Sequence, residues 1–259
     1  EIAMYVTVCS GYQAVMMAPT EILARQHFNT LEKLLKPFGI KIALLTGSVK
    51  QKEKDKIKES LSDGSINVAV GTHALIQGDV EYKSLGLVVT DEQHRFGVIQ
   101  RASLVEKGDQ TKLRAHTLVM SATPIPRTLS LILYGDLKVS ILDQMPPGRQ
   151  KIKTYSVGGE YRERVYAFIK RQISLGHQAY IICPLVEENE DLPRKAVEEY
   201  AENLRSNVFP EIKVGYIHGR LPSREKDKEM LDFCSGNNKI LVSTTVVEVG
   251  VDVPNATVM

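Results

Sequence analysis

The stretch Leu85-Gly86-Leu87-Val88-Val89-Thr90-Asp91-Glu92 joins an apolar run directly to two adjacent carboxylates. The run is short and rich in β-branched residues, which is typical of a strand buried on both faces of a parallel sheet. The two acids then stand at the carboxyl end of that strand, where open α/β sheets bind their ligands. An Asp-Glu pair is common by chance, so its position after a strand, and not the pair itself, indicates a site.

Paired carboxylates at such an edge suit the hydrolysis of a nucleoside triphosphate. We expect Asp91 to hold Mg²⁺ through its bound waters and Glu92 to orient or deprotonate the attacking water. The alternative is that both acids belong to an exposed strand end or a helix cap without chemistry.

Short apolar runs alternate with helical patterns along the rest of the first half, which predicts repeated βαβ units. Residues 20–36 place Ala24, Phe28, Leu31 and Leu35 on one helical face, and a polar helix with Ser48 as its cap is expected at 50–62. Besides 85–90, strands are expected at 14–18, 42–46, 67–71, 117–121 and 139–142.

The segment Met145-Pro146-Pro147-Gly148-Arg149 marks a boundary, because paired prolines and a glycine continue neither helix nor strand. A second α/β unit follows. Its first helix is expected at 160–175, with Tyr161, Val165, Phe168, Ile169 and Ile173 on one face. Further strands are expected at 179–183, 213–217 and 240–243, and further helices at 194–207 and after Pro222. We therefore predict two similar parallel-sheet domains facing a cleft, at 1–144 and 151–259, joined by a linker at 145–150.

Composition excludes several classes of protein. The 259 residues are 43% hydrophobic and 25% charged, as in ordinary soluble globular proteins, and no apolar run approaches the length of a membrane span. The three cysteines include no Cys-x-x-Cys pair, which argues against a disulfide framework or a zinc site and favours a reducing, cytoplasmic setting. The net charge of +2 means that local groups would have to hold any nucleic acid.

Several motifs in the expected order then give the chain a resemblance to a known family. Asp91-Glu92-Gln93-His94 resembles the DEAH-type box of superfamily 2 helicases, and Ser121-Ala122-Thr123 resembles their coupling motif. The longer segments 91–98 and 124–128 are similar to those of RecG-like and Mfd-like double-stranded DNA translocases. The segments 18–27, 145–149 and 183–188 favour the RecG-like branch.

The resemblance implies two RecA-like domains that use ATP and Mg²⁺, with Asp91 and Glu92 as the catalytic carboxylates and Asp91 as the metal ligand. It implies that Gln93, His94, Ser121, Ala122 and Thr123 couple nucleotide state to DNA grip. It places Glu248, Gly250 and Asp252 of the second domain toward the nucleotide. It implies contacts to the DNA backbone, which carry little sequence information, from Pro19, Thr20, Gly71, Thr72, His73, Thr244 and Thr245. For any one of these positions, a cap or turn role is the alternative.

Two motifs of that family are absent. None of the 18 glycines is followed by lysine, so the chain has no P-loop, and the arginine-bearing motif VI is also missing. We expect both to lie outside the chain, so that the first domain lacks its P-loop and first strand and the second is truncated. The implied parent is a bacterial, cytoplasmic, nucleoid-associated and monomeric motor on branched DNA, which regresses stalled forks and migrates Holliday junctions in recombination and repair. The isolated piece is expected to hydrolyse essentially no ATP. Two alternatives stay open: an Mfd-like translocase that displaces RNA polymerase, and a non-catalytic nucleic-acid-binding scaffold.

Overall fold

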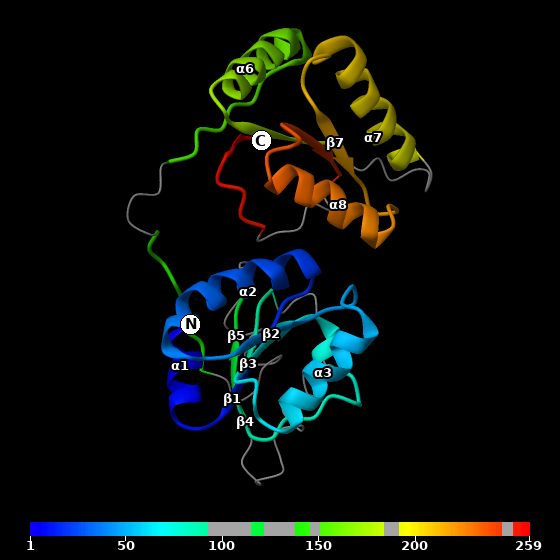
Figure 1. The fold of residues 1–259 in the computed structure, drawn as a ribbon. Coiled ribbons are helices and arrows are strands. Elements are labelled where there is room, and N and C mark those ends of the chain that lie inside the picture. Colours follow the sequence, from blue (N-terminus) through cyan, green and yellow to red (C-terminus); the bar gives the residue numbers. More distant parts are fainter. Residues whose placement is uncertain (93–114, 122–137, 146–150, 184–191, 245–250) are drawn as a thin grey trace.

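The computed structural model describes residues 1–92, 115–121, 138–145, 151–183, 192–244 and 251–259. Within them the chain forms two parallel sheets, each covered by helices on both faces (Figure 1). The two predicted parallel-sheet α/β domains are therefore confirmed. The predicted boundaries at 144 and 151 stay a prediction, because residues 146–150 lie outside the described part.

The first sheet has the strand order β2-β3-β1-β4-β5, and all of its pairings are parallel. Its elements in chain order are α1 (Ile2–Cys9), β1 (Gln13–Met17), α2 (Glu21–Leu35), β2 (Ile42–Leu45), α3 (Gln51–Ser62), β3 (Val68–Gly71), β4 (Leu85–Thr90) and β5 (His116–Val119). Short 3₁₀ turns follow α2, at Lys36–Phe38, and β3, at His73–Leu75. The apolar run that precedes Asp91 and Glu92 is β4, which lies between β1 and the edge strand β5.

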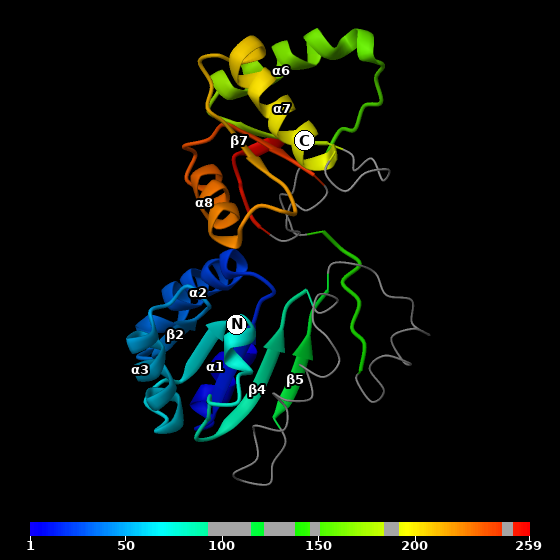
Figure 2. The ribbon, with the colours of Figure 1, turned by 90° about the vertical axis from the view of Figure 1, so that its right-hand side faces the viewer.

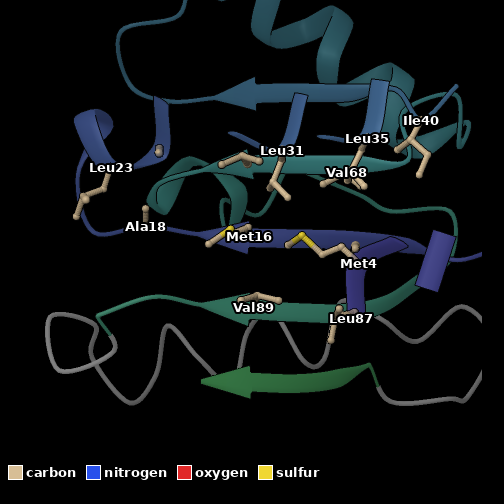
Figure 3. Packing of buried hydrophobic residues seen from close by; sticks show 13 residues of the cluster. Met4, Met16, Ala18, Leu23, Leu31, Leu35, Ile40, Val68, Leu87 and Val89 are labelled. Carbon is tan, nitrogen blue, oxygen red and sulfur yellow. The ribbon is translucent and has the colours of Figure 1, made fainter. Parts of the chain in front are cut away.

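Side chains alternate between the two faces of the first sheet, as the strand period of two requires. Met16, Val68 and Leu87 point to one face, where they pack with Met4 of α1 and with Leu31 of α2 (Figure 3). The other face buries side chains of the same strands against α3 and the 3₁₀ turn after β3; its cluster includes Val15, Met17, Leu45, Leu61, Ala69 and Leu75. Because both faces are covered, the strands read as continuous apolar runs.

The second sheet repeats this plan with the order β7-β8-β6-β9, again all parallel. Its elements are α6 (Arg162–Ser174), β6 (Gln178–Ile182), α7 (Leu192–Asn203), a π turn (Leu204–Val208), β7 (Val214–Ile217), α8 (Ser223–Cys234), β8 (Ile240–Ser243) and β9 (Ala256–Val258). Side chains of α6 and α7 cover one face and those of α8 the other. The strand order matches β2-β3-β1-β4 position by position.

A buried glutamine marks the equivalence of the two sheets. Gln13 opens β1 and donates from Nε2 to the carbonyls of Leu61 (2.9 Å) and Ile66 (2.8 Å). Gln178 opens β6 and donates from Nε2 to two carbonyls at and after the end of α8. Each amide thus ties the start of a central strand to the end of the helix that covers it.

Two expectations about local structure are wrong, and a third is right only in part. Residues 139–142 form no strand: they pair with none of the described strands, and Ile141 and Leu142 are exposed. Ser48 does not cap α3, because Lys50 occupies the cap position and the Ser48 amide donates instead to Glu21 Oε1 (2.8 Å).

The third concerns the helix expected at 160–175. Of the face predicted there, Ile169 and Ile173 pack in the core of the second domain beside Tyr166, whereas Tyr161, Val165 and Phe168 are exposed. Apolar residues occupy both stripes of α6, so periodicity alone could not choose between them.

The two domains meet through α2 and α8, which lie against each other in both views (Figures 1 and 2). Ile22 of α2 packs on the cluster of Tyr180, Ile217, Met230, Phe233 and Leu241 in the second domain. Val251 packs on apolar clusters of both domains. No helix in the described part is long and apolar enough to cross a membrane.

Candidate functional site

The predicted site segments of the first domain follow neighbouring strands at one edge of the sheet. Backbone hydrogen bonds continue one residue beyond the strands, from Ala18 N to Gly71 O (2.9 Å), from Asp91 N to Met17 O (2.9 Å) and from Met120 to Thr90 O (2.9 Å). The segments that begin at residues 18, 71, 91 and 120 are therefore held in register with one another. This brings together motifs up to about 100 residues apart, as expected for the carboxyl ends of parallel strands.

Asp91 is held at this edge by two hydrogen bonds to its carboxylate. Its Oδ1 accepts the Glu92 amide at 2.9 Å, and its Oδ2 lies 2.8 Å from Nε2 of His27 on α2. The hydrogen bond to His27 is the main reason why the pKa of Asp91 is lowered from its usual value, although partial burial acts in the opposite direction. With a fifth of its side chain exposed, Asp91 is an ionised carboxylate that can reach a ligand.

Glu92 follows Asp91 in the chain and is almost fully buried, with 4% of its surface exposed. Its φ of +47° makes it the one non-glycine residue with positive φ in the described part of the chain. Such backbone costs roughly 1–3 kcal/mol and collects at functional sites, where the surrounding structure holds it in place.

The donor set fits Mg²⁺ held mainly by water and substrate. No group of three or more His, Cys, Asp or Glu side chains that could enclose a metal occurs among the described residues. Mg²⁺ in nucleotide enzymes is commonly held by one or two carboxylates together with waters and phosphates. A single ionised, partly exposed Asp91 is compatible with that arrangement.

The predicted DNA-contact positions of the first domain have clear structural roles. Thr20 caps α2, its hydroxyl accepting the Leu23 amide at 3.4 Å. Gly71 is required by packing, because a Cβ there would lie 2.0 Å from the Leu45 carbonyl oxygen. The partly buried Pro19 and Thr72 and the exposed His73 lie on the same edge of the sheet.

In the second domain, Thr244 follows β8 and donates its amide to Ile217 O at 3.3 Å. Its side chain is 2% exposed, and Oγ1 has no hydrogen-bond partner in the described part of the structure. Asp252 is exposed and donates its amide to Oε1 of Gln26 on α2 at 3.1 Å. The second domain thus approaches the first through α2.

The remaining predicted positions divide into two groups. Ser121 is exposed just beyond β5. Outside the described residues lie Gln93, His94, Ala122, Thr123, Thr245, Glu248 and Gly250.

Sequence reasoning missed His27 as a partner of Asp91. The two residues are 64 positions apart, and no motif spacing connects them. Only the topology, which places α2 beside the end of β4, brings them together.

The comparisons with known proteins agree with this geometry. The chain matches the DEAD/DEAH box helicase family over residues 1–132 and the helicase conserved C-terminal domain over residues 161–259. It is 50% identical to the ATP-dependent DNA helicase RecG of Thermotoga maritima over 250 residues, which are 96% of this chain and 32% of that protein. It is also 50% identical to RecG of Bacillus subtilis over 260 residues, covering 100% of this chain and 37% of that protein.

Among solved structures, one of RecG bound to a three-way DNA junction matches with a TM-score of 0.75 and 47% identity, over 95% of this chain and 31% of that one. The predicted RecA-like helicase fold and the similarity to RecG are confirmed. The chain spans about a third of the length of these relatives. Through its match over residues 1–132, this chain belongs to the DEAD/DEAH box helicase family.

Proposed function

We propose that this chain is the motor part of an ATP-dependent DNA helicase that moves on branched duplex DNA. The observation that carries the proposal is the ionised Asp91 at the carboxyl edge of the first sheet, followed in the chain by the buried carboxylate of Glu92. The relatives supply the substrate class, since they are named ATP-dependent DNA helicases and one is bound to a three-way DNA junction. We also propose that the full-length protein regresses stalled forks and migrates Holliday junctions, and that it acts as a monomer in the bacterial cytoplasm and nucleoid.

Within this proposal, Asp91 holds the metal through water and Glu92 accepts the proton of the attacking water. Bound Mg²⁺ would neutralise charge on the phosphates. A general base is worth about 10²–10⁴ in rate, and Glu92 is the carboxylate that directly follows Asp91 in the chain. Asp252 would face the nucleotide from the second domain, and its amide contact with Gln26 supports that position.

The DNA-contact residues would act through hydroxyls and backbone N–H groups on phosphates. Thr20, Gly71 and Thr72 lie on the edge that also carries Asp91, and buried Thr244 occupies the equivalent edge of the second sheet. Contacts of this kind position a strand without reading its sequence. Coupling between nucleotide and DNA would run through Ser121 and through residues 93, 94, 122 and 123.

Hydrolysis also requires a phosphate-binding loop, and no glycine of this chain is followed by lysine. An arginine finger, worth roughly 10³–10⁵ in rate, is part of the same machinery. We therefore propose that the isolated chain hydrolyses essentially no ATP. DNA-stimulated phosphate release by the purified chain would contradict this.

The decisive test is Glu92→Gln in the full-length protein that carries this segment. Turnover stimulated by branched DNA should fall by at least about a hundredfold, while binding of a non-hydrolysable ATP analogue and of a three-way junction is retained. The exposed Glu160→Gln is the matched control and should be without effect. Surviving turnover in Glu92→Gln would remove Glu92 from the role of base, and a full-length protein without turnover would favour the non-catalytic scaffold.

A further inference from the structure

His27 has a contact that its position on a helix does not require. It lies in α2, whose apolar side chains already anchor the helix to the first sheet. Its ring Nε2 nevertheless lies 2.8 Å from Oδ2 of Asp91, and the two side chains are 22% and 20% exposed. A partly exposed histidine gains little by burial, so this hydrogen bond is the main feature that fixes its orientation.

The contact completes the fixation of the Asp91 carboxylate. The backbone amide of Asp91 bonds to Met17, Oδ1 accepts the Glu92 amide, and Oδ2 meets His27. Two other elements, β1 and α2, and the neighbouring Glu92 amide therefore determine where the residue sits and how its side chain is rotated. An ionised carboxylate has about four lone-pair sites, and the two that remain are available to a ligand from the exposed side.

We infer that His27 is a positioning residue for Asp91, holding the carboxylate so that its remaining lone pairs face the waters of the nucleotide's metal ion. The inference rests on the proposed function, which makes Asp91 the metal ligand. Without the ring nitrogen, only the Glu92 amide restrains the carboxylate, which can then rotate toward solvent. Partners that orient a metal ligand are typically worth 10–100-fold in metal affinity.

The position of α2 makes this restraint stiff. Leu23, one turn before His27, is 1% exposed in the apolar cluster of the first domain, and Leu31, one turn after it, is 2% exposed (Figure 3). Buried residues on both sides of His27 hold the helix against the first sheet, where it packs on β2 and β3. The ring therefore belongs to a rigid support and not to a loop.

The test measures metal binding and not turnover. Mn²⁺, which shares the preference of Mg²⁺ for carboxylate and water ligands, is titrated into the full-length protein in the presence of ADP and followed by electron paramagnetic resonance. We expect His27→Ala to weaken Mn²⁺ binding by about tenfold or more, with ADP affinity in the absence of metal unchanged. His27→Gln, whose side-chain amide nitrogen can take the place of Nε2, should restore most of the affinity.

Two further variants separate the possible failures. His116→Ala, an exposed histidine at the opposite end of the sheet, should leave Mn²⁺ binding unchanged. Asp91→Asn should weaken it at least as much as His27→Ala. If Asp91→Asn weakens binding and folded His27→Ala does not, the positioning role of His27 is wrong while the proposed metal site stands.

If Asp91→Asn has no effect, the metal site itself is misplaced and the inference falls with it. Should His27→Ala fail to fold, His27→Leu, which keeps a side chain at this position of α2 but has no donor, takes its place: it should weaken Mn²⁺ binding by the same factor, and unchanged binding in folded His27→Leu would overturn the positioning role. Circular dichroism melting curves establish which variants are folded.

Discussion

Replacing Gln178 by glutamate tests how the second sheet is held to α8. Gln178 is 1% exposed, and its Nε2 donates to the carbonyl oxygens of Phe233 (2.6 Å) and Asn238 (2.9 Å). Glutamate has the same shape but places a carboxylate oxygen where the amide nitrogen was. Both hydrogen bonds are lost, and an acceptor then faces two other acceptors.

The structure sets the size of the effect. A buried carbonyl left without its donor costs about 1–3 kcal/mol, so the two carbonyls together give roughly 2–6 kcal/mol before the buried charge is counted. Domains of this kind are stable by about 5–15 kcal/mol. At pH 7 we therefore expect Gln178→Glu to lower the free energy of unfolding of the second domain by at least about 3 kcal/mol, or to unfold it.

The loss should depend on pH with a definite sign. Burial raises the pKa of a carboxyl in the folded state, so the folded variant binds its proton more tightly than the unfolded chain. The loss of unfolding free energy caused by the charge is then largest above the pKa that the new carboxyl has in the folded protein. It shrinks as pH falls toward about 4.3, the pKa of a glutamate in the unfolded chain. A protonated glutamate also regains one donor.

The measurement is urea unfolding followed by far-UV circular dichroism, since the chain contains no tryptophan, with amide hydrogen exchange to localise the change. Gln13→Glu is the matched control, because Gln13 makes equivalent bonds under the first sheet. It should destabilise β1 and β3 and leave β6 and β8 protected. A Gln178→Glu protein with the wild-type midpoint at pH 7 would refute the reasoning.

Two other predictions follow from the structure. Gly71→Ala should lower the free energy of unfolding by at least about 2 kcal/mol through overpacking, because the new Cβ would meet the Leu45 carbonyl. Gly78→Ala, whose Cβ would have no atom within 4 Å, should leave the thermal unfolding unchanged. Equal effects of the two substitutions would contradict the packing role of Gly71. Burial is the main cause that raises the pKa of the Glu229 carboxyl in the folded protein. The stability that this carboxyl contributes is therefore complete below about pH 4.3, and it is lost as pH rises through the pKa of Glu229 in the folded protein. Glu229→Gln should therefore be more stable than wild type in urea at pH 7 and equal to it at pH 4, and a constant difference across this range would be inconsistent with the shift.

The sequence predicted those features that local chemistry determines. Strand β4 and helix α2 were found within a residue or two, because β4 is a continuous buried run and α2 has a capping threonine before one apolar stripe. The segment 139–142 looked equally apolar but has no neighbouring strand to pair with among the described residues. A strand is stabilised by hydrogen bonds to neighbouring strands, and an apolar run in the sequence does not show whether such neighbours are available.

The contacts that shape the site depend on topology and so could not be predicted. His27 and Asp91 come together only because α2 returns beside the end of β4. The equivalence of Gln13 and Gln178 emerges only when the two strand orders are compared, since the sequence shows no short repeat. Glu92 was expected as a carboxylate near water, and its burial and left-handed backbone are features of the folded chain that no local pattern indicates.

The two domains make their contacts on neighbouring stripes of a single helix. Ile22 and Gln26 of α2, four residues apart, touch the second domain, while Leu23 and His27, also four apart, touch the first. Residues at this spacing lie on one face of a helix, and a step of one residue turns the face by about 100°. A 15-residue helix packed along its length moves as a rigid body. Any movement of the second domain that displaces Ile22 and Gln26 therefore acts on the same body that orients Asp91 through His27.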